Sequence, residues 1–305
     1  MDEGAALRDD GFSHEPTHSG AGGSHRATAG AAGGGAGAGG GSVLRGGERC
    51  AADAGVLHPQ PDEREQPGRQ RSACGILPLS GKLHHPDGIL YNLDETIAKE
   101  YLSQFTYPWE ALAGISDFIK EIGPTLDPEI YEKRGEDIWV AKSATVFDSA
   151  YLHGPLIICE DAEIRQCAFI RGSAIVGKGS VVGNSTELKN VIIFNSVQVP
   201  HYNYVGDSIL GYKSHMGAGS ITSNVKSDKT LVVVKDVYDT KEEIETGRKK
   251  FGAMLGDHVE VGCNSVLNPG TVIGRNSNIY PLSRVRGVIP ANHIFKDKDN
   301  VVLKK

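Results

Sequence analysis

Large apolar residues recur at every sixth position through much of this chain. Stepping by six from one valine meets ten of them in succession: Val140, Val146, Leu152, Ile158, Ile164, Ile170, Val176, Val182, Leu188 and Phe194. The same step resumes at Leu255, Val261, Leu267, Ile273, Ile279 and Val285. Because 39% of all residues are hydrophobic, a run of ten has a chance of roughly one in ten thousand per phase. The period therefore indicates a repeated structural unit.

A period of six matches neither an α-helix nor a single strand. It matches a short strand followed by a turn, three times in each coil. Small residues stand four positions after most of the apolar ones, where a tight corner needs them: Ala144, Ala150, Ala162, Ala168, Ala174, Ser180, Thr186, Ser265, Thr271, Ser277 and Ser283. Stacked coils pair strand on strand at ~4.8 Å, and each coil stabilises its neighbours. The sequence thus predicts an all-β fold, a parallel β-helix of hexapeptide repeats.

The period breaks at two places. After Val205 the next apolar step falls at Leu210, one residue early, and residues 225–253 form an insertion. Insertions in a repeat fold become loops on one face, and such loops often complete a binding site. We therefore predict a β-helix over residues 137–292 with an insertion at 225–253, followed by a C-terminal tail at 293–305.

The first 86 residues have a different composition. Residues 1–75 hold 18 of the 39 glycines, including the run GAAGGGAGAGGGS. Little of this segment can be buried, so the entropy lost on ordering it would not be recovered. We predict disorder over residues 1–86. No Met occurs between Met1 and Met216, which raises the hypothesis that residues 1–86 are not part of the native protein.

Residues 87–136 predict a helical segment. The stretch NLDETIAKEYLSQF offers Asn92 or Asp94 as an N-cap, and PWEALAGISDFIKEIG opens with Pro and ends at Gly123. The apolar residues of the first stretch that share one face are Ile97, Tyr101, Leu102 and Phe105. The stretch DPEIYEKRG repeats this pattern in a shorter form. We expect these helices to pack on the β-helix.

Composition excludes several classes of partner. The formal net charge of −6 implies no basic face for nucleic acid, and no apolar stretch approaches the ~20 residues of a membrane span. The cysteines are Cys50, Cys74, Cys159, Cys167 and Cys263, and no two form a CxxC pair. This spacing argues against a disulfide framework and against a zinc ribbon. We expect a cytoplasmic protein without a nucleic-acid or membrane partner.

Three motifs between Gly183 and Asn224 carry a resemblance to a known family. They are GNSTELK, HYNYVGDS and GAGSITSN, in that order. They resemble the acetyltransferase domain of the bifunctional N-acetylglucosamine-1-phosphate uridyltransferase/glucosamine-1-phosphate acetyltransferase and of shorter sugar-phosphate nucleotidyltransferase-like relatives. The resemblance extends more loosely over residues 140–290, and the family's nucleotidyltransferase domain has no counterpart. It implies a left-handed β-helix, a homotrimer, acetyl-coenzyme A as co-substrate, an amino sugar phosphate such as glucosamine-1-phosphate as acceptor, and no metal.

The resemblance also implies roles for individual residues. His201 falls on the catalytic base, Arg171 and Lys189 on the sugar-phosphate contacts, and Tyr204 and Asn224 on sugar contacts. The stretch Gly217, Ala218 and Gly219 falls on the side of acetyl-coenzyme A.

Three positions depart from the family pattern. His215, at a substrate contact, stands in place of Asn, and Val225 stands in place of Tyr. Cys263, on the coenzyme side, stands in place of Ser. These departures concern the identity of the acceptor more than the type of reaction.

The chemistry of these residue types suits acetyl transfer to an amine. The reaction needs a neutral amine, and His is the side chain that can act as a base near pH 7. A phosphate dianion needs cations, and Arg and Lys supply a planar fork and a point charge. Arg171 and Lys189 are separated by three hexapeptides, which predicts neighbouring coils of one face. His201 lies two rungs further on, on a different face, and a trimer would bring such faces together.

Other interpretations stay open. A metal hydratase on this fold would need three converging His. His201 and His215 are 14 residues apart, and no third close partner is evident. A subunit related to sugar-1-phosphate nucleotidyltransferases that lacks the nucleotidyl domain is a second alternative. A non-catalytic trimeric scaffold that binds sugar nucleotides is a third.

Some single residues also admit a structural interpretation. His215 is either a second polar contact or a neutral substitution. Lys226 and Lys229 either belong to a solvated loop, which is favoured, or touch the coenzyme phosphates. Cys263 is expected to be a small buried residue.

Overall fold

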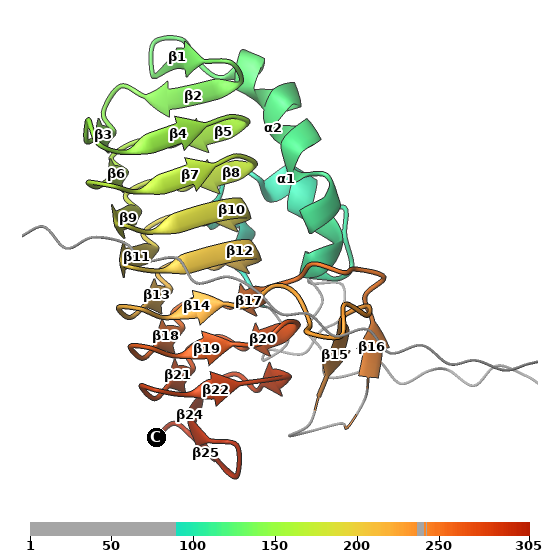
Figure 1. The fold of residues 1–305 in the computed structure, drawn as a ribbon. Helices are drawn as coiled ribbons and strands as arrows, with labels where there is room; N and C mark the ends of the chain where they lie inside the picture. Colours follow the sequence, from blue (N-terminus) through green and yellow to red (C-terminus); the bar gives the residue numbers. More distant parts are fainter. Residues whose placement is uncertain (1–89, 237–240, 242) are drawn as a thin grey trace, which may run out of the picture. The chain divides into compact units, whose positions relative to one another are not determined.

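The computed structural model describes residues 90–236, 241 and 243–305. The predicted disorder of residues 1–86 lies outside this range. The helices come first, as η1 (Leu93–Glu95), α1 (Lys99–Leu102), η2 (Pro108–Ala113), α2 (Ile115–Ile122) and η3 (Gly123–Thr125). The strands that follow stack into about eight coils, which run from green to red in Figure 1. The prediction of a parallel β-helix with a short helical segment before it is confirmed.

Each coil contributes strands to three faces. The first face contains β2 (Ile138–Ala141), β5 (Leu156–Ile158), β8 (Ala174–Val176), the second halves of β10 (Glu187–Ile193) and β12 (Tyr204–Leu210), β17 (Ala253–Leu255), β20 (Thr271–Ile273) and β23 (Val288–Ile289). The second face contains β3 (Thr145–Val146), β6 (Glu163–Ile164), β9 (Val181–Asn184), β11 (Gln198–His201), β13 (His215–Met216), β18 (Glu260–Val261), β21 (Asn278–Ile279) and β24 (His293–Asp297). The third face contains β4 (Tyr151–His153), β7 (Phe169–Arg171), the first halves of β10 and β12, β14 (Ile221–Thr222), β19 (Val266–Leu267) and β22 (Arg284–Val285).

The register shows where the six-residue period fails. Leu156 pairs with Ala174, a full three hexapeptides later, but Val176 pairs with Ile193, which comes one residue too early for that spacing. The sequence had placed Phe194 at this step, so it missed this first shortened coil. The corner that follows Ile170 uses two residues of positive φ, Gly172 at 98° and Ser173 at 50°. The shortened corner has a single residue of positive φ, Asn190 at 56°. This one left-handed residue turns the chain, so the corner is one residue shorter than the corner at Gly172 and Ser173.

The second shortened coil turns at Asp207, whose φ is 48°. Leu188 pairs with Val205 and Ile193 with Leu210, and both steps fall one residue short of three hexapeptides. This is the early step that the sequence indicated. Asn190 and Asp207 follow one another in successive coils at the junction of the third and first faces, which we call the Asp207 corner.

The helical segment covers the first face. The strand Leu156–Ile158 has no exposed residue, and Ala174–Val176 is likewise fully buried. Helix α2 contacts β8 and β10, and η2 contacts β12, so both sides of this parallel sheet are excluded from water (Figure 1). A sheet buried on both sides needs continuous apolar runs, and each fully buried Leu or Ile contributes about 1.5–3 kcal/mol. The first face therefore reads LII, AIV and VII in successive coils.

The helix signals are only partly confirmed. Asn92 caps η1 through its side chain, which accepts from the Asp94 amide, and α2 ends at Gly123. Ile97, however, is 38% exposed instead of packed with its predicted neighbours. The stretch around Tyr131 is not a helix. It forms β1 (Tyr131–Gly135), which pairs antiparallel with β2.

Antiparallel strands close both ends of the β-helix. Strand β1 covers the edge of the first coil, because Tyr131 pairs with Ala141. Residues 293–305, expected as a tail, instead supply β24 and β25 (Asn300–Leu303), which pair antiparallel. An open coil would present unpaired N–H and C=O groups to other chains. Strands β1 and β25 cover these edges. The hexapeptide pattern carries no signal for them, because the edges exist only in the folded chain.

The insertion leaves the β-helix at the Asp207 corner. Ile209 pairs directly with Met254, so the chain between β14 and β17 contributes no strand to the coils. Part of it forms the antiparallel pair β15 (Val233–Lys235) and β16 (Glu243–Glu245). Val232 and Val234 are fully buried. The insertion is thus a partly packed structure beside the corner that carries Asn190 and Asp207.

Asp257 fastens the helical segment to the β-helix. Its Oδ2 accepts from the Asn92 amide at 2.7 Å and its Oδ1 from the Tyr212 amide at 2.9 Å. Arg275 Nη2 lies 3.3 Å from Oδ2, and the carboxylate is fully buried. Burial raises the pKa of Asp257, although the two amides and Arg275 act in the opposite direction. Two peptide donors from distant parts of the chain therefore depend on this carboxylate.

We expect Asp257→Asn to lower the free energy of unfolding by about 1–3 kcal/mol. The new amide would turn a donor toward one of the two peptide N–H groups and leave that group without an acceptor. Urea denaturation followed by circular dichroism measures the change. An Asn variant as stable as the original protein would mean that Asp257 does not anchor the segment.

Candidate active site

The predicted base and the predicted coenzyme loop share one corner, at the junction of the second and third faces. His201 ends β11, is exposed, and pairs in register with Asn184 of the coil before. Its Nδ1 lies 3.4 Å from Asn184 Oδ1, and its carbonyl accepts from the Gly219 amide at 3.0 Å. Asn264 in turn donates its amide to the carbonyl of Ala218 at 2.8 Å. We call this the His201 corner.

The two glycines of the predicted coenzyme loop are required by the fold itself. A Cβ on Gly217 would lie 2.7 Å from the amide nitrogen of Cys263. Gly219 has a φ of 71°, and a Cβ there would lie 2.2 Å from Asn264 Oδ1. The pattern GAG is therefore explained by the packing of coils, with or without a coenzyme. Cys263 is exposed, so the expectation that it is a buried residue was wrong. The turn directs its side chain outward beside Gly217.

The predicted sugar-phosphate and sugar contacts gather on the third face. Leu188 pairs with Ile170, which sets Lys189 beside Arg171 in neighbouring coils. Tyr204 follows in the next coil, where it pairs with Glu187. Asn224 Nδ2 lies 3.2 Å from Tyr204 Oη. The structure therefore places these four predicted residues on consecutive coils.

Two carboxylates that the sequence analysis missed lie among them. Arg171 Nε is 2.6 Å from Glu187 Oε1, and the pair is one-third to two-fifths exposed. Lys189 Nζ is 2.9 Å from Asp207 Oδ1, and Asp207 is only 2% exposed. The missed residues stand inside the quoted motifs, Glu187 in TELK and Asp207 in VGDS. Each is separated from its cation by about the length of one coil, and this spacing could have indicated both of them.

The charges of this cluster shift the pKa of its members. Burial raises the pKa of Tyr204, and the nearby carboxylates of Glu187 and Asp207 raise it further. The hydrogen bond to Glu187 raises the pKa of Arg171. Burial lowers the pKa of Arg248, from the insertion, while the charge of Asp207 opposes this shift. Tyr204 thus remains a neutral hydroxyl at physiological pH.

His215 does not join the cluster. It begins β13 on the second face, where it pairs with Gln198 and lies 2.8 Å through Nδ1 from Glu260 Oε2. Lys226 is held within the insertion, because its Nζ lies 3.3 Å from Asp228 Oδ2. Within the described ranges, no three His, Cys, Asp or Glu residues are grouped as metal ligands.

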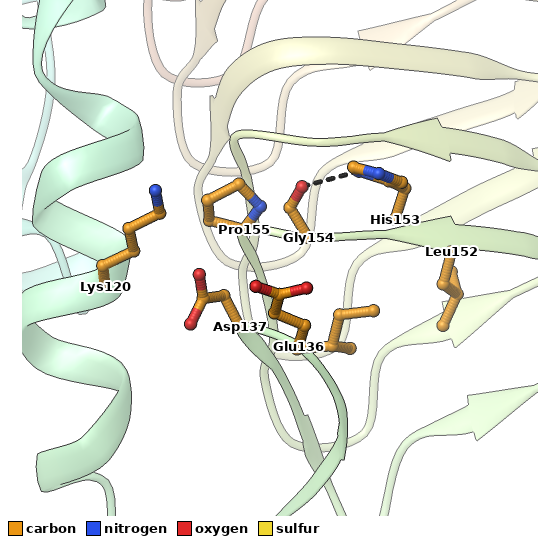
Figure 2. Close-up of a pocket in the computed structure, with 8 residues that line it drawn as sticks. Lys120, Glu136, Asp137, Leu152, His153, Gly154 and Pro155 are labelled. Carbon is orange, nitrogen blue, oxygen red and sulfur yellow. Dashed lines mark hydrogen bonds between the residues drawn. The ribbon is translucent and has the colours of Figure 1, made fainter.

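A pocket of about 460 Å³ lies one coil before Arg171. Figure 2 shows Lys120 from α2 facing Asp137 and Pro155, with His153 on the far side. His153 pairs with Arg171 in the strand register. No predicted site residue lines this pocket. On the single chain Arg171 and His201 are exposed, whereas Lys189, Tyr204 and Asn224 are half-buried.

Comparisons with known proteins agree with this architecture. The family described as "GMPPB C-terminal domain" matches residues 152–249, which include His201 and the third-face cluster. The bifunctional protein GlmU of Methanococcus vannielii is 32% identical over 207 residues, 67% of this chain and 49% of that protein. The domain is GlmU-like. A bifunctional sugar-1-phosphate nucleotidylyltransferase/acetyltransferase of Sulfurisphaera tokodaii is 33% identical over 169 residues, 50% of this chain and 41% of that protein.

The GlmU-like chain spans about half the length of the curated relatives that it matches. Among solved structures, the polySia specific acetyltransferase NeuO shares 16% identity at a TM-score of 0.37, over 53% of this chain and 80% of that one. That likeness is too remote to support an argument. None of the helices in the described residues is long and apolar enough to cross a membrane.

Proposed function

We propose that the GlmU-like domain transfers acetyl from acetyl-coenzyme A to an amino sugar phosphate, with glucosamine-1-phosphate as the first acceptor to test. One observation carries the proposal. The exposed His201 and the loop Gly217–Gly219 share a corner, and the adjoining third face holds a cluster of cationic and amide side chains. The acetyltransferase named in the Sulfurisphaera tokodaii relative supports the same reaction type.

In this mechanism the amine nitrogen of the sugar attacks the thioester carbonyl carbon. A bond forms between nitrogen and carbon, the carbon–sulfur bond breaks, and His201 takes the proton that the amine loses. The proton then passes to the departing coenzyme thiolate, which leaves as the thiol. Peptide N–H groups of the coils at the His201 corner would stabilise the oxyanion that forms on the carbonyl.

The third face would bind the acceptor through its phosphate and hydroxyl groups. Arginine has five N–H donors, and Glu187 takes the one on Nε of Arg171, which leaves donors for a phosphate. Lys189 is 24% exposed and contributes a second cation. Tyr204 and Asn224 would orient the sugar ring. Glu187 and Asp207 partly neutralise the cations, so hydrogen bonds as well as charge would determine phosphate affinity.

The exposure of Arg171 and His201 on one chain fits a site completed by further copies. We propose a homotrimer in which the His201 corner of one chain and a neighbouring chain enclose the acceptor. His215, on the second face, would then contact a substrate bound against the adjacent chain. Cys263, exposed at the His201 corner, would lie on the coenzyme side.

Release of coenzyme thiol with a panel of acceptors tests the proposal. We expect release with glucosamine-1-phosphate or galactosamine-1-phosphate, much less with glucosamine, and none beyond background with N-acetylglucosamine-1-phosphate. The phosphate supplies the charged group for Arg171 and Lys189, and the acetylated sugar has no free amine. A protein that binds these sugars by calorimetry but releases no thiol with any of them would be a scaffold, which would contradict the proposal.

A further inference from the structure

Asp207 is a buried carboxylate to which the mechanism above assigns no substrate contact. Its two oxygens receive four contacts from three side chains. Lys189 Nζ lies 2.9 and 3.1 Å from Oδ1 and Oδ2. Asn190 Nδ2 donates to Oδ1 at 2.9 Å, and Asn224 Nδ2 donates to Oδ2 at 2.5 Å. A carboxylate has about four acceptor positions, so these neighbours saturate it.

Asp207 fixes which way the amide of Asn224 faces. One N–H of Asn224 Nδ2 goes to Asp207 and the other to Tyr204 Oη, at 3.2 Å. A flipped amide would set its carbonyl oxygen against the carboxylate, which is repulsive. The carbonyl oxygen Oδ1 is therefore the only group of this side chain left to face a substrate. It can only accept a hydrogen bond, so it requires a hydroxyl or an amine.

The same contacts set the roles of Tyr204 and Lys189. Tyr204 Oη accepts from Asn224, which leaves its O–H proton to be donated elsewhere. Lys189 has three protons for the two oxygens of Asp207, so one donor remains. Tyr204, Lys189 and Asn224 thus offer two donors beside one acceptor, in addition to the donors of Arg171.

The position of Asp207 is itself fixed by the two elements outside the coils. Its carbonyl accepts from the Gly252 amide at 2.8 Å, where the insertion returns to the β-helix. Asn190 Nδ2, which donates to Asp207, also lies 3.0 Å from the carbonyl of Leu112 in η2. The insertion therefore holds the backbone of Asp207, and the helical segment holds Asn190, one of the donors to its carboxylate.

We propose that Asp207 is a positioning residue that sets the hydrogen-bond polarity of the acceptor site. Through Asn224 and Lys189 it selects a sugar phosphate that presents oxygen acceptors to Lys189 and Tyr204 and a hydroxyl or amine donor to Asn224. The inference rests on the proposed function, because it names how the same site recognises its substrate. Asp207 touches none of the reacting atoms.

Asp207→Asn keeps the size of the side chain and tests the proposal. We expect the KM for glucosamine-1-phosphate to rise about 10- to 100-fold, because the Asn224 amide is free to flip and Lys189 is no longer held in place by the carboxylate. The KM for acetyl-coenzyme A should stay unchanged. Asp257→Asn is the matched control, since it also removes a buried carboxylate paired with a cation. It should lower stability without changing either KM.

Asn224→Asp is the second variant, for the case in which Asp207→Asn fails to fold. It sets two carboxylates side by side and should raise the same sugar KM, while the half-buried position tolerates the change. An unchanged sugar KM in either folded variant, or an equal rise in both KM values, would overturn the proposal.

Calorimetric titration with glucosamine-1-phosphate and with inorganic phosphate separates this inference from the proposed function. Weaker binding by Asp207→Asn than by Asp257→Asn supports the role of Asp207, even if the protein transfers no acetyl group. Equal affinities of the two variants overturn it. A wild-type protein that binds neither probe contradicts both the proposed function and this inference.

Discussion

Replacing His201 with Ala is expected to lower kcat for acetyl transfer to glucosamine-1-phosphate about 10²–10⁴-fold. A general base in contact with the reacting amine contributes a factor of this size. His201 is exposed and its ring has one long contact, 3.4 Å to Asn184. The variant should therefore keep the stability of the original protein. Initial rates of thiol release, with thermal unfolding in parallel, measure both quantities.

His258→Ala is the control for His201→Ala. His258 is also an exposed His at a corner of the β-helix, but it follows Asp257 between the first and second faces. We expect it to leave kcat within about twofold, since it contacts no reacting group. Full activity of His201→Ala, or equal losses in both variants, would contradict the assignment of the base.

Replacing Gly183 with Ala is expected to destabilise the β-helix by about 3 kcal/mol or more. A Cβ at this position would lie 1.5 Å from the carbonyl oxygen of Pro200 and 2.0 Å from its carbon. Both atoms belong to the backbone of the next coil, so no rotamer change relieves the clash. The coil that carries His201 would have to move as a whole. Urea denaturation, or loss of soluble protein, reports the effect.

Gly247→Ala shows how much of this loss comes from the clash. Gly247 has a φ of 67°, and nothing lies within 4 Å of the Cβ that Ala would add. Its substitution should cost only the strain of a left-handed Ala, about 1–2 kcal/mol. If Gly183→Ala were as stable as Gly247→Ala, the close approach of successive coils at Gly183 would be wrong.

The six-residue period made the core predictable. An inward position recurs once per strand, and Ile170, Val182 and Leu188 are indeed fully buried. The helical segment that covers the first face could be predicted in part. Pro108 and Gly123 mark the start and the end of helices through their own backbone preferences, which do not depend on the rest of the fold. The same period assigned Phe194 to the inward position that Ile193 occupies. A corner shortened by one residue shifts the phase of the repeat, and the shift is hidden because Ile193 and Phe194 are both apolar.

The six-residue apolar period did not by itself give the polar contacts of the site, although each carboxylate lies about one coil from its cation. Outward residues carry no periodic constraint, so the partners of Arg171 and Lys189 depend on which coils become neighbours. The residue that connects the cluster, Asp207, appears in the sequence only as one acidic residue in a short motif. Strand β1 was missed for a related reason, because its pairing with β2 satisfies an edge that exists only in the folded chain.

Identification of the reaction product tests the account most directly. The full chain is incubated with acetyl-coenzyme A and glucosamine-1-phosphate, and the sugar products are separated and analysed by mass spectrometry. We predict a sugar phosphate acetylated on its amine, with the phosphate retained, in an amount equal to the thiol released. Free acetate in its place, or unconsumed acetyl-coenzyme A in the presence of folded protein, would contradict the account.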